Sequence, residues 1–354
     1  MLVYNECLKI LKNTSRIIRE NDLDIIIKPI PDDDRSGVPD PRMIESVLKS
    51  RNHMSPLDTS HITEKEIYTL RSQMGCENID LSCAVMKQSL ELTTSAGDVP
   101  VCIYTPDSTQ GNLALVVYIH GGAFIGGTTG VVENACKLTA ERSEAVVISV
   151  SYALAPENQF PCGLEQCNQV VQWAFEHATS LGCDPKKLVV MGDSAGANLA
   201  TACCMLDLDH RIMLQVLLYP VTQLVKDVEK WDYSRYTICE HEEILKNIVY
   251  DIGTAKEICR SLYVSHPEEL MNPLISPLQA RSLKEMPETL IITAEFDYLR
   301  LEAEEYARRL QEDGVKTMIL RYNGINHSFF EHTGEFPQAE DCTNEIANVI
   351  QSLH

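Results

Sequence analysis

A single serine, Ser194, lies between two glycines in the segment GDSAG. An apolar, β-branched run precedes this segment, and a helix-forming run, ANLATACCML, follows it. Where a strand turns directly into a helix, the residues two positions before and after the turn residue approach so closely that a Cβ would clash. This crowding explains glycine at positions 192 and 196. Because the turn would hold the hydroxyl beside the Ala195 amide and the positive helix end, the pattern predicts a nucleophilic serine.

A serine hydroxyl becomes a good nucleophile only when a base takes its proton, and a carboxylate must orient that base. When such a serine follows a strand, the acid and then the histidine come later in the chain, each on a loop after a strand. His327 follows the strand-like run KTMILRY and is the predicted base, with His332 and His354 as alternatives. Asp297 follows the run LIITAEF and is the predicted acid, with Glu295 as its main competitor.

A second glycine-rich segment, HGGAFIGG, follows another strand-like run. Its flexible backbone would allow N–H groups to point at an oxyanion that develops during acyl transfer. We expect the amides of Gly122 and Ala123 to be two of the donors and the amide of Ala195 to be the third. His120, at the start of this segment, is predicted to brace the loop and not to act as a second base.

Six short apolar runs alternate with helix-like segments from about residue 114 onward. The runs are LALVVYIH (113–120), AVVISVSY (145–152), KLVVMGD (187–193), LQVLLYP (214–220), ETLIITAE (288–295) and KTMILRY (316–322). Helical patterns lie at 132–142, 164–181, 195–206 and 300–312. This alternation predicts a mostly parallel sheet with helices on both faces, and the segments 86–94 and 98–105 predict an antiparallel hairpin that leads into it.

Two regions interrupt the alternation. Residues 1–80 are charged and mostly helical in periodicity, beginning with an amphipathic helix. The segment 222–270 carries apolar residues at helical spacing, namely Ile244, Leu245, Ile248, Val249 and Ile252. We expect both regions to pack together as a cap. The predicted organisation is therefore an N-terminal helical segment (1–80) that contributes to the cap and a catalytic domain (81–354) that carries the cap insertion.

Composition excludes several classes of function. The chain of 354 residues has 30 Lys and Arg against 51 Asp and Glu, a net charge of −21 that disfavours nucleic acid as a partner. No apolar run approaches the roughly 18 residues needed to span a bilayer, and the N-terminal residues lack a secretory pattern, so we expect a cytoplasmic protein without stable membrane insertion. Thirteen cysteines without metal-finger spacing predict reduced core thiols and no metal or cofactor. A homodimer through a sheet edge is compatible with this pattern.

Six segments occur in the order HGGAFIGG, SYALAPENQFP, GDSAGANLA, NPLISPL, TAEFDYLR and NHSFF. With them, the chain from about residue 80 to the C-terminus resembles the hormone-sensitive lipase-like family of α/β-hydrolase serine esterases. The resemblance implies an α/β-hydrolase fold with a mostly parallel central sheet flanked by helices, and a helical cap. Three departures stand out: Ala123 replaces the third glycine of HGGG, SYALAPE replaces DYRLAPE, and Tyr298 and Leu301 alter the family's DPLRD.

The predicted function is that of a serine esterase. The resemblance implies hydrolysis of short- to medium-chain carboxylic esters, and the residues predict an acyl-enzyme on Ser194 with Asp297 and His327 completing the triad. The expected ligand is a small-molecule ester. Two alternatives stay open: a peptidase or amidase with the same triad, and a small-ligand receptor that keeps the fold without catalysis. The presence of His327 argues against the receptor.

Overall fold

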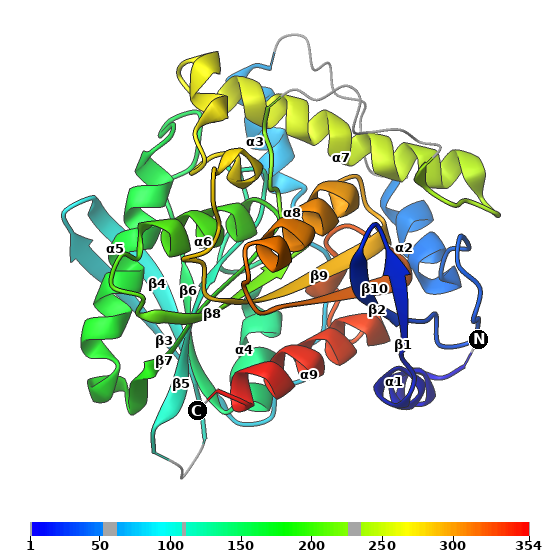
Figure 1. The fold of residues 1–354 in the computed structure, drawn as a ribbon, viewed down its shortest axis with the longest axis horizontal. Helices are drawn as coiled ribbons and strands as arrows, with labels where there is room; N and C mark the ends of the chain where they lie inside the picture. The colour runs from blue at the N-terminus through cyan, green and yellow to red at the C-terminus, as the bar shows by residue number, and fades with distance from the viewer. Residues whose placement is uncertain (1, 52–61, 108–110, 226–234, 354) are drawn as a thin grey trace.

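A ten-stranded sheet forms the centre of the structure (Figure 1). The computed structural model describes residues 2–51, 62–107, 111–225 and 235–353. The strand order across the sheet is β1-β2-β10-β9-β8-β7-β5-β6-β4-β3. The strands are β1 (Arg16–Glu20), β2 (Leu23–Lys28), β3 (Val85–Thr94), β4 (Gly97–Pro106), β5 (Leu113–Ile119), β6 (Ala145–Val150), β7 (Cys183–Asp193), β8 (Ile212–Leu218), β9 (Glu288–Phe296) and β10 (Thr317–Asn326).

The middle of the sheet is parallel, as the apolar runs predicted. Strands β5 to β10 pair in parallel with one another, and every residue of β5 and β6 is buried. The predicted hairpin is also present, since β3 and β4 pair antiparallel and β4 continues antiparallel onto β6. Because parallel strands share one direction, the carboxyl ends of β5, β7, β9 and β10 lie along the same edge of the sheet.

Helices cover both faces of the sheet (Figure 1). One face is covered by α4 (Glu133–Ser143) and α9 (Pro337–Gln351), and α1 (Tyr4–Asn13) packs on α9. The other face is covered by α5 (Cys162–His177), α6 (Ala195–Leu206) and α8 (Arg300–Glu312). The two apolar cores that result hold the sheet rigidly between them, so the loops at its carboxyl edge are positioned by a packed scaffold.

The expectation of a helical N-terminal segment is wrong for residues 16–28. These residues form the antiparallel hairpin β1–β2, and β2 pairs in parallel with β10, so the hairpin extends the sheet at one end. Asn21 and Asp22 have φ of 51° and 61°, as a two-residue hairpin turn requires. Leu23, Ile25 and Ile27 are buried at alternate positions. This period of two is the strand signal that the sequence contained.

A buried lysine ties this hairpin to the rest of the protein. The ammonium of Lys28, 2% exposed, lies 2.9 Å from a carboxylate oxygen of Asp341 and 2.6 Å from one of Glu345, both on α9. It also donates to the carbonyl of Leu11 at 2.9 Å. Burial alone would lower the pKa of Lys28, but the two carboxylates raise it above the ordinary value. The ion pair is therefore formed at neutral pH.

Lys28→Ala is expected to lower the free energy of unfolding by ~3–5 kcal/mol, because it leaves the buried carboxylate of Asp341 without its cation. The matched control is Arg19→Ala in the same hairpin, whose ion pair with Asp24 is exposed, at 62% and 59%. That change should cost less than about 1 kcal/mol. Urea denaturation of both variants measures the difference. Equal losses would show that the hairpin is not anchored by Lys28.

The cap is smaller than expected. The insertion contributes the long helix α7 (Glu242–Leu262), and the N-terminal segment contributes α3 (Glu64–Ser72). The helix α2 (Pro41–Arg51) contacts β10. The two regions meet where Arg35 pairs with Glu240 at 2.8 Å. The helix α1 and the β1–β2 hairpin pack against α9 and the sheet instead, because their apolar side chains continue those surfaces.

Candidate active site

Ser194 occupies a sharp turn between β7 and α6. Its φ of 52° and ψ of −116° are strained for a residue with a side chain. A Cβ on Gly192 would lie 2.6 Å from the backbone of Gly196, and a Cβ on Gly196 would lie 2.0 Å from the carbonyl oxygen of Ile119. Both glycines are therefore required by the close approach of β5 to the turn. The serine is presented at the first turn of α6, as the motif predicted.

Three loops bring Ser194, His327 and Asp297 together. The Nε2 atom of His327 lies 3.0 Å from Oγ of Ser194, and its Nδ1 atom lies 2.8 Å from a carboxylate oxygen of Asp297. Ser194 and His327 are each 9% exposed and Asp297 is fully buried. The second oxygen of Asp297 accepts the Leu299 amide at 2.9 Å, which fixes the carboxylate. The arrangement can pass a proton from the hydroxyl to the imidazole while the carboxylate orients the ring.

The competing acid, Glu295, has a different role. It lies on β9, and its two carboxylate oxygens accept the amides of Gly37 and Gly324, each at 2.8 Å. Burial raises the pKa of this carboxyl, and the two hydrogen bonds oppose that rise. Glu295 therefore joins the N-terminal segment to the loop that precedes His327. Within the described ranges Glu295 makes no hydrogen bond or ion pair with His327, whose Nδ1 atom faces Asp297 instead.

Of the two alternative histidines, the structure describes His332, whose contacts are to residues other than Ser194. His332 follows a short 3-10 helix (Phe329–Glu331), lies 2.6 Å from a carboxylate oxygen of Glu335 and stacks on Phe336. It is partly buried. His354 lies outside the described residues.

The loop after β5 has the backbone shape that an oxyanion site needs. Gly122, Ala123 and Phe124 all have positive φ, at 115°, 59° and 62°. Among the residues that the structure describes, the amides of Gly122, Ala123 and Ala195 make no hydrogen bond to the protein. The carbonyl of Gly122 accepts the amides of Ile125 and Gly126, at 3.1 and 2.9 Å, and closes the loop. The three predicted donors are thus available to a ligand.

His120 braces this loop, as the sequence predicted. Its Nδ1 atom lies 2.7 Å from the carbonyl oxygen of Gly121, and its ring stacks on Tyr152 with centroids 4.5 Å apart. Burial lowers the pKa of His120 to about 4, so the ring is neutral near pH 7. A neutral Nδ1–H donates to the Gly121 carbonyl, which fixes the start of the glycine-rich segment.

A buried carboxylate that the sequence reasoning missed joins the serine turn to the oxyanion loop. Asp193 accepts the Tyr118 hydroxyl and the Gly121 amide, each at 2.9 Å. Burial raises the pKa of Asp193 to about 6, against the lowering effect of these two hydrogen bonds. The signal in the sequence was a carboxylate at the end of an apolar strand, where an unpaired charge would be costly.

The match to a family model decides the classification. Residues 116–331, which include the serine, acid and histidine, match the model described as alpha/beta hydrolase fold. The chain belongs to the α/β-hydrolase family. The resemblance to hormone-sensitive lipase-like esterases is thereby confirmed, as is the fold class, a mostly parallel sheet flanked by helices.

Relatives of this α/β-hydrolase are esterases. It is 35% identical over 232 residues to an arylesterase of Saccharolobus solfataricus, which covers 66% of this chain and 73% of the relative. It is 30% identical over 263 residues to the carboxylesterase NlhH of Mycobacterium tuberculosis, with 73% and 79% covered. A solved hyperthermophilic esterase from Pyrobaculum calidifontis superposes with a TM-score of 0.74 at 27% identity, covering 89% of this chain and 98% of that one. The α/β-hydrolase is a carboxylic ester hydrolase.

In the described part of the chain, no helix is both long and apolar enough to cross a bilayer. No group of three or more histidine, cysteine or acidic side chains in those residues is arranged to hold a metal ion. All thirteen cysteines fall within the described ranges, and each is a free thiol.

Proposed function

We propose that this α/β-hydrolase cleaves short- to medium-chain carboxylic esters through an acyl-enzyme on Ser194. The observation that carries the proposal is the position of the His327 ring, with one nitrogen 3.0 Å from the serine oxygen and the other 2.8 Å from Asp297. A ring held in this way accepts the hydroxyl proton at Nε2 and keeps its other proton on Nδ1, facing the carboxylate.

Acylation begins when the Ser194 oxygen attacks the ester carbonyl carbon. His327 takes the serine proton, and Asp297 stabilises the imidazolium that forms. Negative charge develops on the former carbonyl oxygen, where the amides of Gly122, Ala123 and Ala195 donate to it. The carbon–oxygen bond to the alcohol then breaks, and the alcohol leaves with the proton that His327 returns.

Deacylation repeats the sequence with water. His327 removes a proton from a water molecule, which attacks the acyl carbon of the ester on Ser194. The same three amides stabilise the second tetrahedral oxyanion, and the serine oxygen leaves with a proton from the imidazolium. A carboxylic acid is released, and the free enzyme is restored without any cofactor entering a step.

The cysteine content supports a reducing compartment. The chain carries thirteen free thiols, most of them buried in the cores. Free thiols in such number persist where glutathione and thioredoxin keep cysteines reduced. We propose a cytoplasmic location on this ground, and a small-molecule ester as the partner of the enzyme.

Acyl-chain dependence tests the proposed substrate class. We expect kcat/KM for p-nitrophenyl esters to be highest for acyl chains of two to about six carbons and to fall steeply beyond them, because Ser194 and His327 are each only 9% exposed. Stopped assays with Ser194→Ala provide the blank. The matched p-nitroanilides should react far more slowly, since amine expulsion is harder. A flat or rising profile with chain length, or faster cleavage of the anilides, would contradict the proposal.

A further inference from the structure

The last two turns of α7 present one face to the catalytic machinery. Lys256, Cys259, Arg260 and Tyr263 are spaced at i, i+3, i+4 and i+7, so they share one side of the helix and its end. Cys259 and Tyr263 contact the oxyanion loop, and Arg260 contacts the segment beside Ser194. Lys256 pairs with Glu302 of α8. This face is therefore a candidate for a positioning role that neither the triad nor the glycine-rich loop supplies by itself.

The oxyanion loop needs support from outside. Ala123 and Phe124 are consecutive residues with side chains in the left-handed region, at φ of 59° and 62°. Side chains disfavour this region, and two neighbours there persist only when surrounding contacts hold them. A glycine at position 123 would adopt the same φ without strain. Alanine at this position therefore makes the loop depend on its neighbours.

Contacts from α7 supply that support on both residues. The Cys259 thiol donates to the carbonyl of Ala123 at 3.1 Å. The Phe124 ring stacks on Tyr263 with centroids 3.9 Å apart and planes 14° from parallel. Cys259 is 3% exposed, and burial raises the pKa of its thiol to about 12, so it remains a protonated donor at neutral pH. The carbonyl of Ala123 and the side chain of Phe124 are thus both held against α7.

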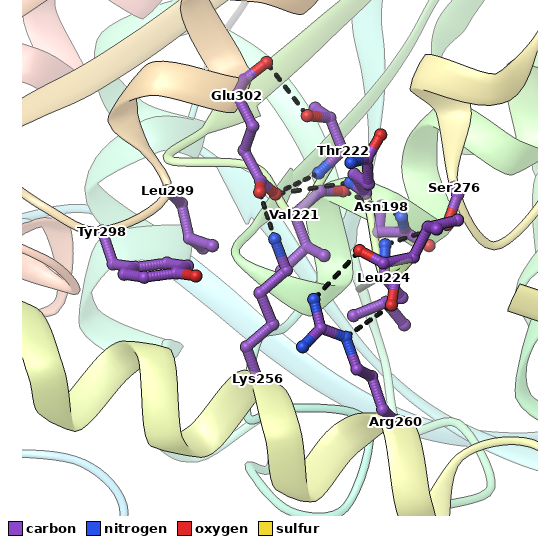
Figure 2. Close-up of polar contacts among 12 residues, drawn as sticks. Asn198, Val221, Thr222, Leu224, Lys256, Arg260, Ser276, Tyr298, Leu299 and Glu302 are labelled. Atoms are coloured by element: carbon purple, nitrogen blue, oxygen red, sulfur yellow. Dashed lines mark hydrogen bonds and ion pairs between the residues drawn. The ribbon is translucent and has the colours of Figure 1, made fainter. Parts of the chain in front are cut away.

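Charged groups one turn away anchor α7 to the catalytic domain. Figure 2 shows Lys256 reaching Glu302 of α8, and the two side chains of this ion pair are only 6% and 12% exposed. Glu302 in turn accepts the amide of Thr222 at 3.0 Å. Arg260 donates to the carbonyls of Leu224 and Val225, at 2.5 and 3.0 Å. These bonds fix the C-terminal half of α7 on the catalytic domain, next to the oxyanion loop.

The loop that receives these bonds also contacts the nucleophile. The amide of Val221 donates to the carbonyl of Ser194 at 3.2 Å, and Asn198 of α6 donates to the carbonyl of Val221 at 2.8 Å. The serine turn and the end of α7 are therefore joined through one short segment, 221–225. The end of α7 therefore contacts the oxyanion loop through Cys259 and, through Arg260, the segment that is bonded to Ser194.

We propose that Cys259 is a positioning residue for the oxyanion site, holding Ala123 in the strained conformation that aims its amide at the reacting oxygen. This inference rests on the proposed function, in which that amide stabilises the tetrahedral oxyanion. Cys259 touches no reacting atom. It acts through the peptide between Ala123 and Phe124, whose carbonyl accepts its thiol. The ion pair between Lys256 and Glu302 fixes the position of α7 on the catalytic domain, so that Cys259 stays in contact with Ala123.

Cys259→Ala is expected to lower kcat/KM for p-nitrophenyl acetate about tenfold, with the loss in kcat, since removal of a whole oxyanion donor costs ~10²–10³ and a displaced one retains part of its effect. Cys259→Ser keeps a donor and should stay within about threefold of the wild type. The matched control is Cys342→Ala, a buried thiol on α9 that should leave turnover per active site unchanged. Active sites are counted by titration with a fluorophosphonate, so misfolded protein does not enter the rate.

Rescue by glycine separates positioning from general damage. In an Ala123→Gly background position 123 no longer needs the Cys259 contact, and Tyr263 still holds Phe124, so adding Cys259→Ala should cost less than about twofold. The affinity for a trifluoromethyl ketone, whose adduct with serine carries an oxyanion, should fall in step with kcat in Cys259→Ala alone. A wild-type kcat in Cys259→Ala, or the same cost in both backgrounds, would overturn the inference. Retained turnover in Ser194→Ala would instead overturn the proposed function, so the two failures are distinguishable.

Discussion

Ser194→Ala is expected to lower kcat for p-nitrophenyl acetate by about 10⁶-fold, the size of effect seen when a serine nucleophile is removed from a triad. Without the hydroxyl, no acyl-enzyme forms, and only the residual action of the oxyanion donors on water remains. The histidine loses its hydrogen-bond partner at 3.0 Å but keeps Asp297. The fold should survive, because alanine fits the turn that glycines at 192 and 196 create.

Burst kinetics and mass spectrometry check this prediction. Wild-type protein mixed with a slow ester substrate should gain the mass of one acyl group, and Ser194→Ala should gain none. Ser180→Ala, which alters an exposed serine bonded only to the His177 carbonyl, controls for contaminating hydrolases and for preparation. Turnover by Ser194→Ala within tenfold of the wild type would show that another residue carries the acyl group.

Asp297→Asn is expected to reduce kcat by about 10⁴-fold, as in serine proteases, because the amide presents an N–H where the imidazole needs an acceptor. The ring then turns or takes the wrong tautomer, and Nε2 no longer accepts the serine proton. The carboxylate is fully buried and close to Nδ1, so solvent does not replace it. The loss should appear in acylation and deacylation alike, since His327 acts in both.

Glu295→Gln is the matched control for this prediction. It makes the same chemical change two residues earlier, on a carboxylate that accepts the amides of Gly37 and Gly324. One oxygen becomes an NH₂ group facing a backbone N–H, so the free energy of unfolding should fall by about 1–3 kcal/mol. The kcat should stay within about tenfold of the wild type. A larger loss of kcat in Glu295→Gln than in Asp297→Asn would exchange the two assignments.

Much of the fold followed from short-range patterns. Runs such as 113–120 and 145–152 are nearly all apolar and rich in β-branched residues, which is typical of strands covered on both faces. The β1–β2 hairpin escaped detection because its alternation spans only about a dozen residues and lies among charged segments with helical periodicity. Pairing with β10 stabilises it, and Lys28 finds its partners on α9, more than 300 residues later. Neither contact can be predicted from the residues around the hairpin in the sequence.

In the active site, too, some residues could be predicted from the sequence and others depended on tertiary contacts. Ser194 and its glycines were identified from sequence alone, because a strand that turns into a helix at one residue imposes its steric demands on immediate neighbours. The choice between Asp297 and Glu295 depended on the tertiary structure, because both are carboxylates at the end of one strand and only their hydrogen-bond partners differ. The contact between Cys259 and Ala123 joins residues 136 positions apart. Local steric demands and hydrophobic periodicity involve residues that are close in the chain, so they can be predicted from the sequence. The pairing of distant polar groups depends on how the packed layers align, so only the tertiary structure decides it.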